Sequence, residues 1–122
     1  MTARDTVIEQ LEQLDLGAAK VMPYATNLLV VDRPTVMVRV DNITPDPRAR
    51  VWRRYDIALV LVVPKTEPGP ADDQLDGLLE DVLHELEKDT TPLTWTAAKR
   101  AVFQEGYPAY EVVLSVPFDK EQ

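Results

Sequence analysis

The sequence contains no cysteine, a single histidine and only four glycines among its 122 residues. Without cysteine, the chain forms no disulfide and offers neither a thiolate nucleophile nor thiolate ligands for zinc. The four glycines are isolated from one another, which excludes a glycine-rich phosphate-binding loop. The longest apolar run, residues 57–64, is eight residues long and too short to span a bilayer. Because the N-terminus also lacks a signal-like apolar run, we expect neither secretion nor membrane association.

Groups that commonly perform catalysis are scarce. His84 follows Glu80 by four residues, a spacing that places both on one helical face and suits a metal ion, but one histidine and one carboxylate do not complete a site. Asp76 and Glu80 have the same spacing and would serve acid–base chemistry only if buried. Ser115 has no serine-nucleophile motif around it. We therefore expect no enzyme activity, no cofactor and no bound metal.

The net charge of −8 is concentrated in one part of the chain. Residues 67–92 contain nine acidic side chains and one basic one, whereas residues 41–66 contain three acidic and five basic ones. An acidic surface repels the nucleic acid backbone rather than binding it. The sequence thus predicts an acidic face that is either solvated or turned toward a partner, formed by Asp72, Asp73, Asp76, Glu80 and Glu87.

The clearest periodicity lies in residues 72–89. Apolar side chains recur there in steps of three and one, the spacing of one helical face; they are Leu75, Leu78, Leu79, Val82, Leu83 and Leu86. This spacing predicts an amphipathic helix that is capped by Asp72 or Asp73 and ends at residues 90–92. Residues 64–71 contain three prolines and a glycine, which favours an exposed loop.

A second amphipathic helix is predicted over residues 4–16. Thr2 and Asp5 match a capping box at its start, and Gly17 is suited to end it. Residues 17–27 are then expected to form a connector.

Alternating apolar and polar side chains predict four strands, and residues 41–47 between the first two predict a loop. The strands are residues 35–40, 51–63, 93–103 and 109–118; the run at 28–32 is a further candidate. For residues 96–104, TAAKRAVFQ, a helix is the alternative. The predicted fold is one α+β domain spanning residues 1–122, in the order α-β-β-α-β-β. It has one mainly antiparallel sheet with two helices packed on one face.

Two features of the strand at 51–63 point to contact with another protein. Its second half is apolar on both faces, so we expect another subunit to cover Val60 and Val62. Its start carries a basic cluster, in which Trp52 lies among Arg48, Arg50, Arg53 and Arg54. Basic and aromatic residues together bind single-stranded nucleic acid in some proteins, but the acidic chain favours an acidic protein surface. The alternative is a set of solvated arginines.

The predicted acidic helix supplies such a surface within the same sequence. A basic segment of one copy that meets the acidic helix of the next makes a heterologous contact, which forms a ring if the rotation closes.

The order of these segments resembles the tail terminator proteins of long-tailed bacteriophages. The resemblance covers most of the chain and is carried by the N-terminal amphipathic helix, RRYDIALVLVVP, the acidic helix DDQLDGLLEDVLHEL and the final GYPAYEVVLSVPF. It implies a structural virion protein of the tail neck, assembled in the host cytoplasm. It also implies a homohexameric ring that caps the tail tube protein, stops tube growth and meets the head–neck connector. Genomic DNA would pass through the lumen without specific binding, and the acidic helix is a candidate lining.

Two other functions fit the same features. One is another neck or head–tail connector protein. The other is a small cellular adaptor domain that dimerises through the open face of the sheet.

Overall fold

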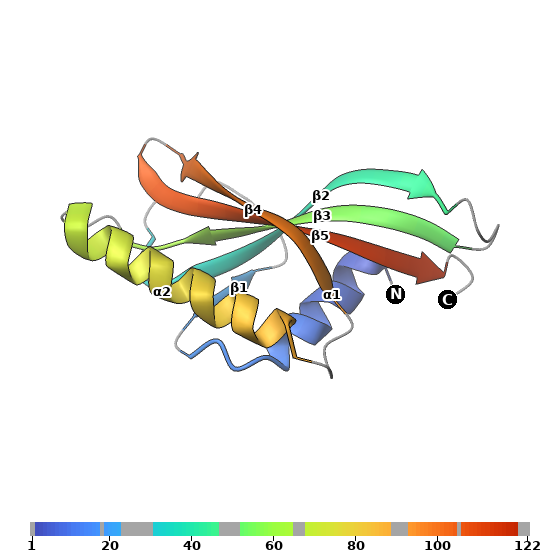
Figure 1. Cartoon of the computed structure of the whole chain (residues 1–122), viewed down its shortest axis with the longest axis horizontal. Helices are drawn as coiled ribbons and strands as arrows, with labels where there is room; N and C mark the ends of the chain where they lie inside the picture. The colour runs from blue at the N-terminus through green and yellow to red at the C-terminus, as the bar shows by residue number, and fades with distance from the viewer. Residues whose placement is uncertain are drawn as a thin grey trace.

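Two helices and one five-stranded sheet make up the described part of the chain (Figure 1). The computed structural model describes residues 2–17, 19–22, 31–46, 52–64, 68–88, 93–104 and 106–119. In chain order, the elements are α1 (Ala3–Glu12), β1 (Lys20–Met22), β2 (Thr35–Pro45), β3 (Trp52–Val62), α2 (Pro68–Leu86), β4 (Thr94–Phe103) and β5 (Tyr107–Asp119). The strands lie in the order β1-β2-β3-β5-β4, and every neighbouring pair except β1 and β2 is antiparallel.

The predicted α+β class is confirmed, and the order gains one strand. β1 was expected to be part of a connector, but it pairs parallel to β2, with Val21 opposite Val36. Three residues are too few to show any periodicity, so pairing with β2 alone defines this strand. Within the candidate run at 28–32, Val31 and Asp32 are not in a strand, and residues 28–30 lie outside the described part.

Both helices pack on one face of the sheet, as predicted (Figure 1). Leu75, Val82 and Leu86 of α2 are buried, and Leu79 is partly buried beside them. They pack with one face of the long central strands and with α1; the buried partners are Val7, Leu11, Val36, Val38, Ile57, Leu59, Leu61, Val112 and Leu114. Removing these apolar side chains from water is the main force that holds helices and sheet together.

α1 begins as expected and ends early. The Thr2 hydroxyl accepts from the Asp5 N–H, and the Asp5 carboxylate accepts from the Thr2 N–H, each over 3.1 Å. These bonds hold the pKa of Asp5 below its ordinary value. The helix stops at Glu12, four residues before the predicted end. Gly17 therefore serves the following turn, with a φ of +63° that few other residues adopt.

α2 begins four residues before its predicted start. Pro68 and Pro70, expected in a loop, lie in its first turn, where a helix does not need the N–H that proline lacks. Asp72 and Asp73 consequently lie inside the helix and do not cap it. The helix ends at Leu86, and residues 90–92, where its end is predicted, lie outside the described part.

The other face of the sheet has a smaller apolar cluster of its own. Met37, Val60, Val62 and Ala109 are buried there against Val31, with Phe103 and Tyr107 beside them. Val60 and Val62 are only 4% and 0% exposed within the single chain. The structure thus removes the reason for expecting another subunit to cover them.

Two irregularities change the predicted strand boundaries and faces. β2 continues to Pro45, through residues that were expected to form a loop, because a bulge between Val40 and Asn42 keeps it paired with β3. A second bulge, between Trp95 and Ala97, reverses the alternation of β4. Trp95 therefore lies on the helix face. Regular alternation would place Phe103 on the same face, but it lies in the cluster on the other face.

Candidate interaction surfaces

The predicted acidic face is present along α2. Its carboxylates point away from the leucine face and are all exposed; they are Asp72, Asp73, Asp76, Glu80 and Glu87, together with Asp81, which was not among the predicted residues. Glu80 and His84 are both exposed. Among the described residues, no three His, Asp or Glu side chains are grouped closely enough to hold a metal ion. The arrangement along α2 suits an electrostatic contact surface better than a catalytic centre.

Glu85, four residues after Asp81, has a different role. It is buried, and its carboxylate accepts a hydrogen bond from the Asp15 N–H over 2.8 Å and pairs with Lys88. Lys88 and then the Asp15 N–H hold the pKa of Glu85 below its ordinary value of 4.5. Glu85 thus fixes the end of α2 to the segment that follows α1.

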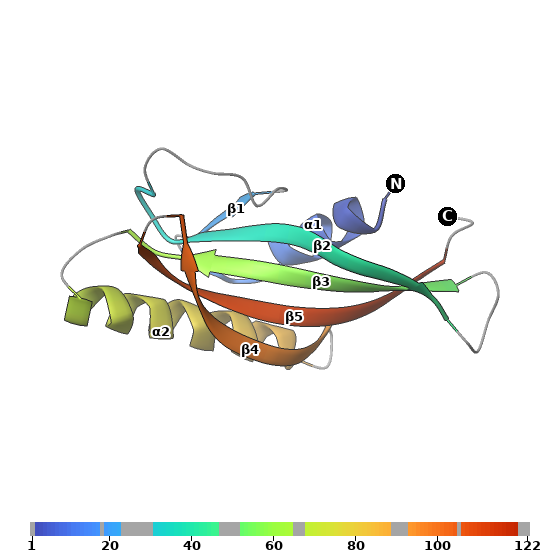
Figure 2. The same cartoon turned by 90° about the horizontal axis from the view of Figure 1, so that it is seen from above.

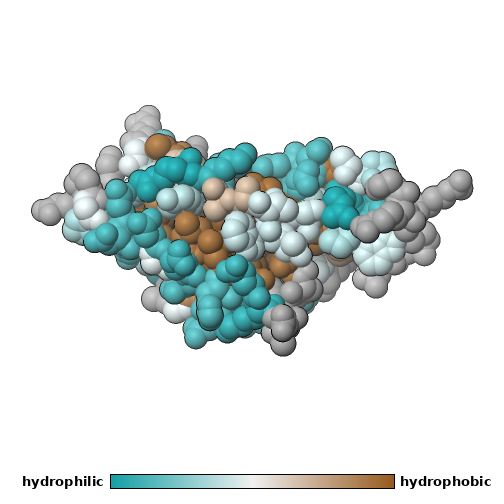
Figure 3. Space-filling view, in the orientation of Figure 1, coloured by the Kyte–Doolittle hydropathy of each residue, from teal (hydrophilic) through white to brown (hydrophobic). Residues whose placement is uncertain are grey.

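An ion pair connects the start of the acidic face with edge strand β4. Arg100 donates from Nη2 to Asp72 Oδ1 over 2.8 Å, and its guanidinium lies 5.5 Å from the centre of the Tyr110 ring. Asp72 raises the pKa of Arg100. Apolar side chains gather between α2 and β4, beside the hydrophilic surface of the helix (Figure 3). The acidic face and the β4 edge are therefore adjacent parts of one surface.

The described part of the predicted basic cluster divides into exposed and paired residues. Trp52 is 38% exposed and Arg53 is exposed at the start of β3. Arg54 instead donates to Ser115 Oγ over 2.8 Å and lies 3.6 Å from the carboxylate of Asp46, which is buried. Arg54 therefore has a structural role within the protomer. Arg48 and Arg50 lie outside the described residues.

The acidic face and the described part of the basic cluster lie toward opposite ends of the molecule. The end of β2 and the start of β3, which carries Trp52 and Arg53, project beyond both helices (Figures 1 and 2). α2 begins near the other end of the sheet. A single protomer thus does not bring Arg53 to the carboxylates at the start of α2, whereas two protomers arranged head to tail would do so.

The open face of the sheet carries a charged group of its own. Arg39 donates to Asp41 over 2.6 Å and to both carboxylate oxygens of Glu111 over 3.1 Å. Asp41 and then Glu111 raise the pKa of Arg39. This group borders a cavity of about 160 Å³ with an apolar floor that includes Val60 and Ala109. Arg39 and Glu111 thus lie beside the apolar cluster of the open face, which contains Val60 and Ala109.

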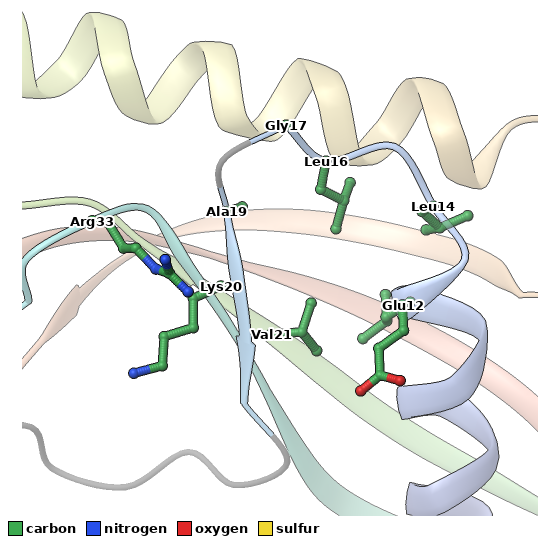
Figure 4. A pocket seen from close by; sticks show the side chains of 9 residues that line it. Glu12, Leu14, Leu16, Gly17, Ala19, Lys20, Val21 and Arg33 are labelled. Atoms are coloured by element: carbon green, nitrogen blue, oxygen red, sulfur yellow. The ribbon is translucent and has the colours of Figure 1, made fainter.

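A larger cavity of about 350 Å³ lies beside the end of α1 and β1 (Figure 4). Leu11, Leu16 and Val21 contribute apolar walls, and the charged lining residues are Glu12, Lys20 and Arg33. The lining residues include no histidine or serine. The two lining side chains of a type that can act as a nucleophile, Glu12 and Lys20, are both exposed to solvent.

No protein-family model matches this sequence, and comparison with curated proteins finds no match. None of the described helices combines the length and apolarity that crossing a membrane requires.

Proposed function

We propose that this chain is a ring-forming tail terminator of a long-tailed bacteriophage. In this function it caps the tail tube, stops its polymerisation and presents a surface to the head–neck connector. The observation that carries the proposal is the separation of charge along the protomer. The acidic face of α2 lies toward one end, and Trp52 and Arg53 are exposed at the other.

Opposite charges at the two ends of a protomer favour a heterologous contact. Such a contact joins two different surfaces, so every added copy exposes the same pair again, and the series ends when rotation closes a ring. An isologous dimer could also pair the two patches, but only if the protomers lay antiparallel side by side. A contact in which one end meets the other is heterologous, and it favours a ring over an adaptor that dimerises through the open sheet face.

Burial on the open face gives a second reason to prefer the ring. An adaptor that dimerised there would use the apolar positions of β3, but Val60 and Val62 are already covered within the chain. Arg39 and Glu111 pair beside them. Burying that ion pair in a dimer would require its desolvation, which often exceeds the gain from its Coulomb attraction.

The acidic charge also agrees with passage of DNA. A ring that surrounds DNA during ejection must not bind its phosphates, and carboxylates repel them. Asp76 and Glu80 are exposed on α2 and have no ion-pair partner among the described residues. In the proposed ring, carboxylates that do not meet the next copy face the lumen.

Assembly of tail tubes tests the proposal. The tail tube protein of the same phage is polymerised with and without this chain, and the tubes are examined by electron microscopy. We expect added protein to limit tube length and to form a ring at one end. Tubes of unchanged length with no terminal ring would exclude the function. A ring found only between the capsid portal and the neck would identify another connector protein instead.

A further inference from the structure

The sheet has two edges that the described part of the chain leaves unpaired. β4 is the last strand of the sheet along its whole length. On the other side, β1 pairs only with Thr35–Met37, and Arg4 Nη1 donates to the carbonyl oxygen of Val38. The remainder of β2, residues 40–45, has no strand beside it among the described residues. Such edges present N–H and C=O groups that can pair with another strand; at Pro45 only the C=O group is present.

Each unpaired edge carries one exposed aliphatic side chain. Val102 on β4 is 70% exposed, and Ile43 on β2 is 51% exposed. Ile43 lies opposite Tyr55 and Val102 opposite Pro108. Tyr55 belongs to the helix face, as does Tyr110, two residues after Pro108. Ile43 and Val102 therefore point to the same face of the sheet and would meet if the two edges were joined.

The charges of the two edges differ. The exposed part of β4 carries Lys99 and Arg100 and no carboxylate. Residues 40–45 carry one charged side chain, Asp41, which accepts from Arg39. Like charges on facing strands oppose their pairing. Pairing of β4 with β4 would bring the basic side chains of two copies together, whereas pairing of β4 with residues 40–45 of β2 would not.

Strand direction allows this pairing to continue the sheet. β2 and β5 run one way, and β3 and β4 run the other. A second copy in a similar orientation therefore presents β2 antiparallel to β4. When Ile43 is opposite Val102 in an antiparallel pair, residues 42–45 of β2 face residues 100–103 of β4. The two exposed aliphatic side chains thus define one register for the contact.

We propose that β4 of one copy pairs edge to edge with the end of β2, residues 42–45, in the next copy. The proposal names the contact surface of the ring and so rests on the proposed function. The same contact places the neighbour's Arg53 on the side of α2, near its start, where Asp73 and Asp76 are exposed. The strand edge and the charge patches are thus parts of one heterologous interface.

Two variants with one blocked edge each test this contact. Val102→Lys blocks β4, and Ile43→Lys blocks β2; both sites are exposed, so the protomer retains its fold, which circular dichroism checks. Each variant alone has no competent pair of edges. Mixed in equal amounts, they retain one unblocked β4 edge and one unblocked β2 edge between them.

We expect each variant alone to be monomeric and the mixture to form a dimer that grows no further, measured by light scattering. Gln13→Lys, an equal charge change at the end of α1, is the control and should assemble as wild type.

The outcomes separate this inference from the proposed function. Wild type that forms a ring while both variants also form it would overturn the edge contact and leave the ring standing. Monomeric variants whose mixture stays monomeric would also overturn it, since the two edges would then not be each other's partners. Wild type that remains monomeric at millimolar concentration would overturn both proposals.

Discussion

Arg100 donates a 2.8 Å hydrogen bond to the Asp72 carboxylate, and this ion pair joins edge strand β4 to α2. The two elements follow each other in sequence but belong to different layers. Their connection makes the acidic helix face and the basic strand edge parts of a single surface. That surface is the one proposed to receive the exposed end of the β2–β3 pair from the next copy.

Replacing Arg100 by Ala is expected to affect assembly more than folding. Both partners are about half exposed, with side-chain exposures of 48% and 54%. Exposed ion pairs of this kind contribute up to about 1 kcal/mol, so urea unfolding should show a loss no larger than that. The oligomer should dissociate at lower salt than wild type, because β4 has lost a positive charge. A loss of folding stability well above this range would assign Arg100 to the core of the fold.

Arg53 and Arg54 are adjacent in sequence, and charge reversal should separate their roles. Arg53→Glu changes an exposed side chain, so we expect unchanged unfolding and weaker self-association, most visibly at low salt. Arg54→Glu places a carboxylate beside the buried Asp46 carboxylate and loses the bond to Ser115. Loss of such a charged contact costs about 2 kcal/mol in the free energy of unfolding. Equal stability of the two variants would contradict the assignment of Arg54 to the protomer interior.

Glu85 should make stability depend on pH at the acid end. Its pKa is lowered in the folded chain, so the folded state favours the ionised form and binds a proton less readily than the unfolded state. The contribution is therefore fully present above the ordinary carboxyl pKa of 4.5 and is lost as pH falls through the lower folded value. Glu85→Gln removes the ionisation and should flatten the acid limb of a plot of unfolding free energy against pH. An unchanged slope would show that the pKa of Glu85 is the same in the folded and the unfolded state.

The same substitution at two glycines should have opposite effects. Gly77 lies in the middle of α2, and a Cβ there would meet no atom within 4 Å. Gly77→Ala should therefore raise the free energy of unfolding by about 1 kcal/mol, through the higher helix propensity of Ala. Gly17 has a φ of +63°, a left-handed conformation that is unfavourable for alanine. Gly17→Ala should therefore lower the free energy of unfolding by roughly 1–2 kcal/mol. Thermal denaturation of the monomer measures both; a destabilised Gly77→Ala would show that the helix needs glycine there.

Periodicity was sufficient to predict the elements that pack against the core. The leucine face of α2 and the alternation at Ile57, Leu59 and Leu61 follow directly from burial on one side, so sequence and structure agree there. The capping box at Thr2 and Asp5 was also predictable, because it is a local exchange of hydrogen bonds. These features depend on neighbours along the chain or on a simple division between core and solvent.

Other features depended on partners distant in sequence. Pro45 suggested a loop, yet it lies near the end of β2. An edge strand tolerates proline at a position where the missing N–H would not have bonded to the neighbouring strand. The bulge between Trp95 and Ala97 reverses which side chains of β4 face the helices, and alternation alone cannot predict it. Arg54 looked like the other arginines, and only Asp46 and Ser115, brought near by the sheet, distinguish it. The acidic face was predicted in full except for Asp81, but its relation to β4 required the structure.

The molar mass of the wild-type chain in solution, measured by light scattering across protein concentration at low and high salt, tests the central claim most directly. Heterologous association that closes predicts one fixed oligomer at low salt, a hexamer by the family resemblance, and dissociation as salt screens the charged surfaces. A chain that stays monomeric at every concentration would contradict the account, as would a mass that keeps rising with concentration and never reaches a closed stoichiometry.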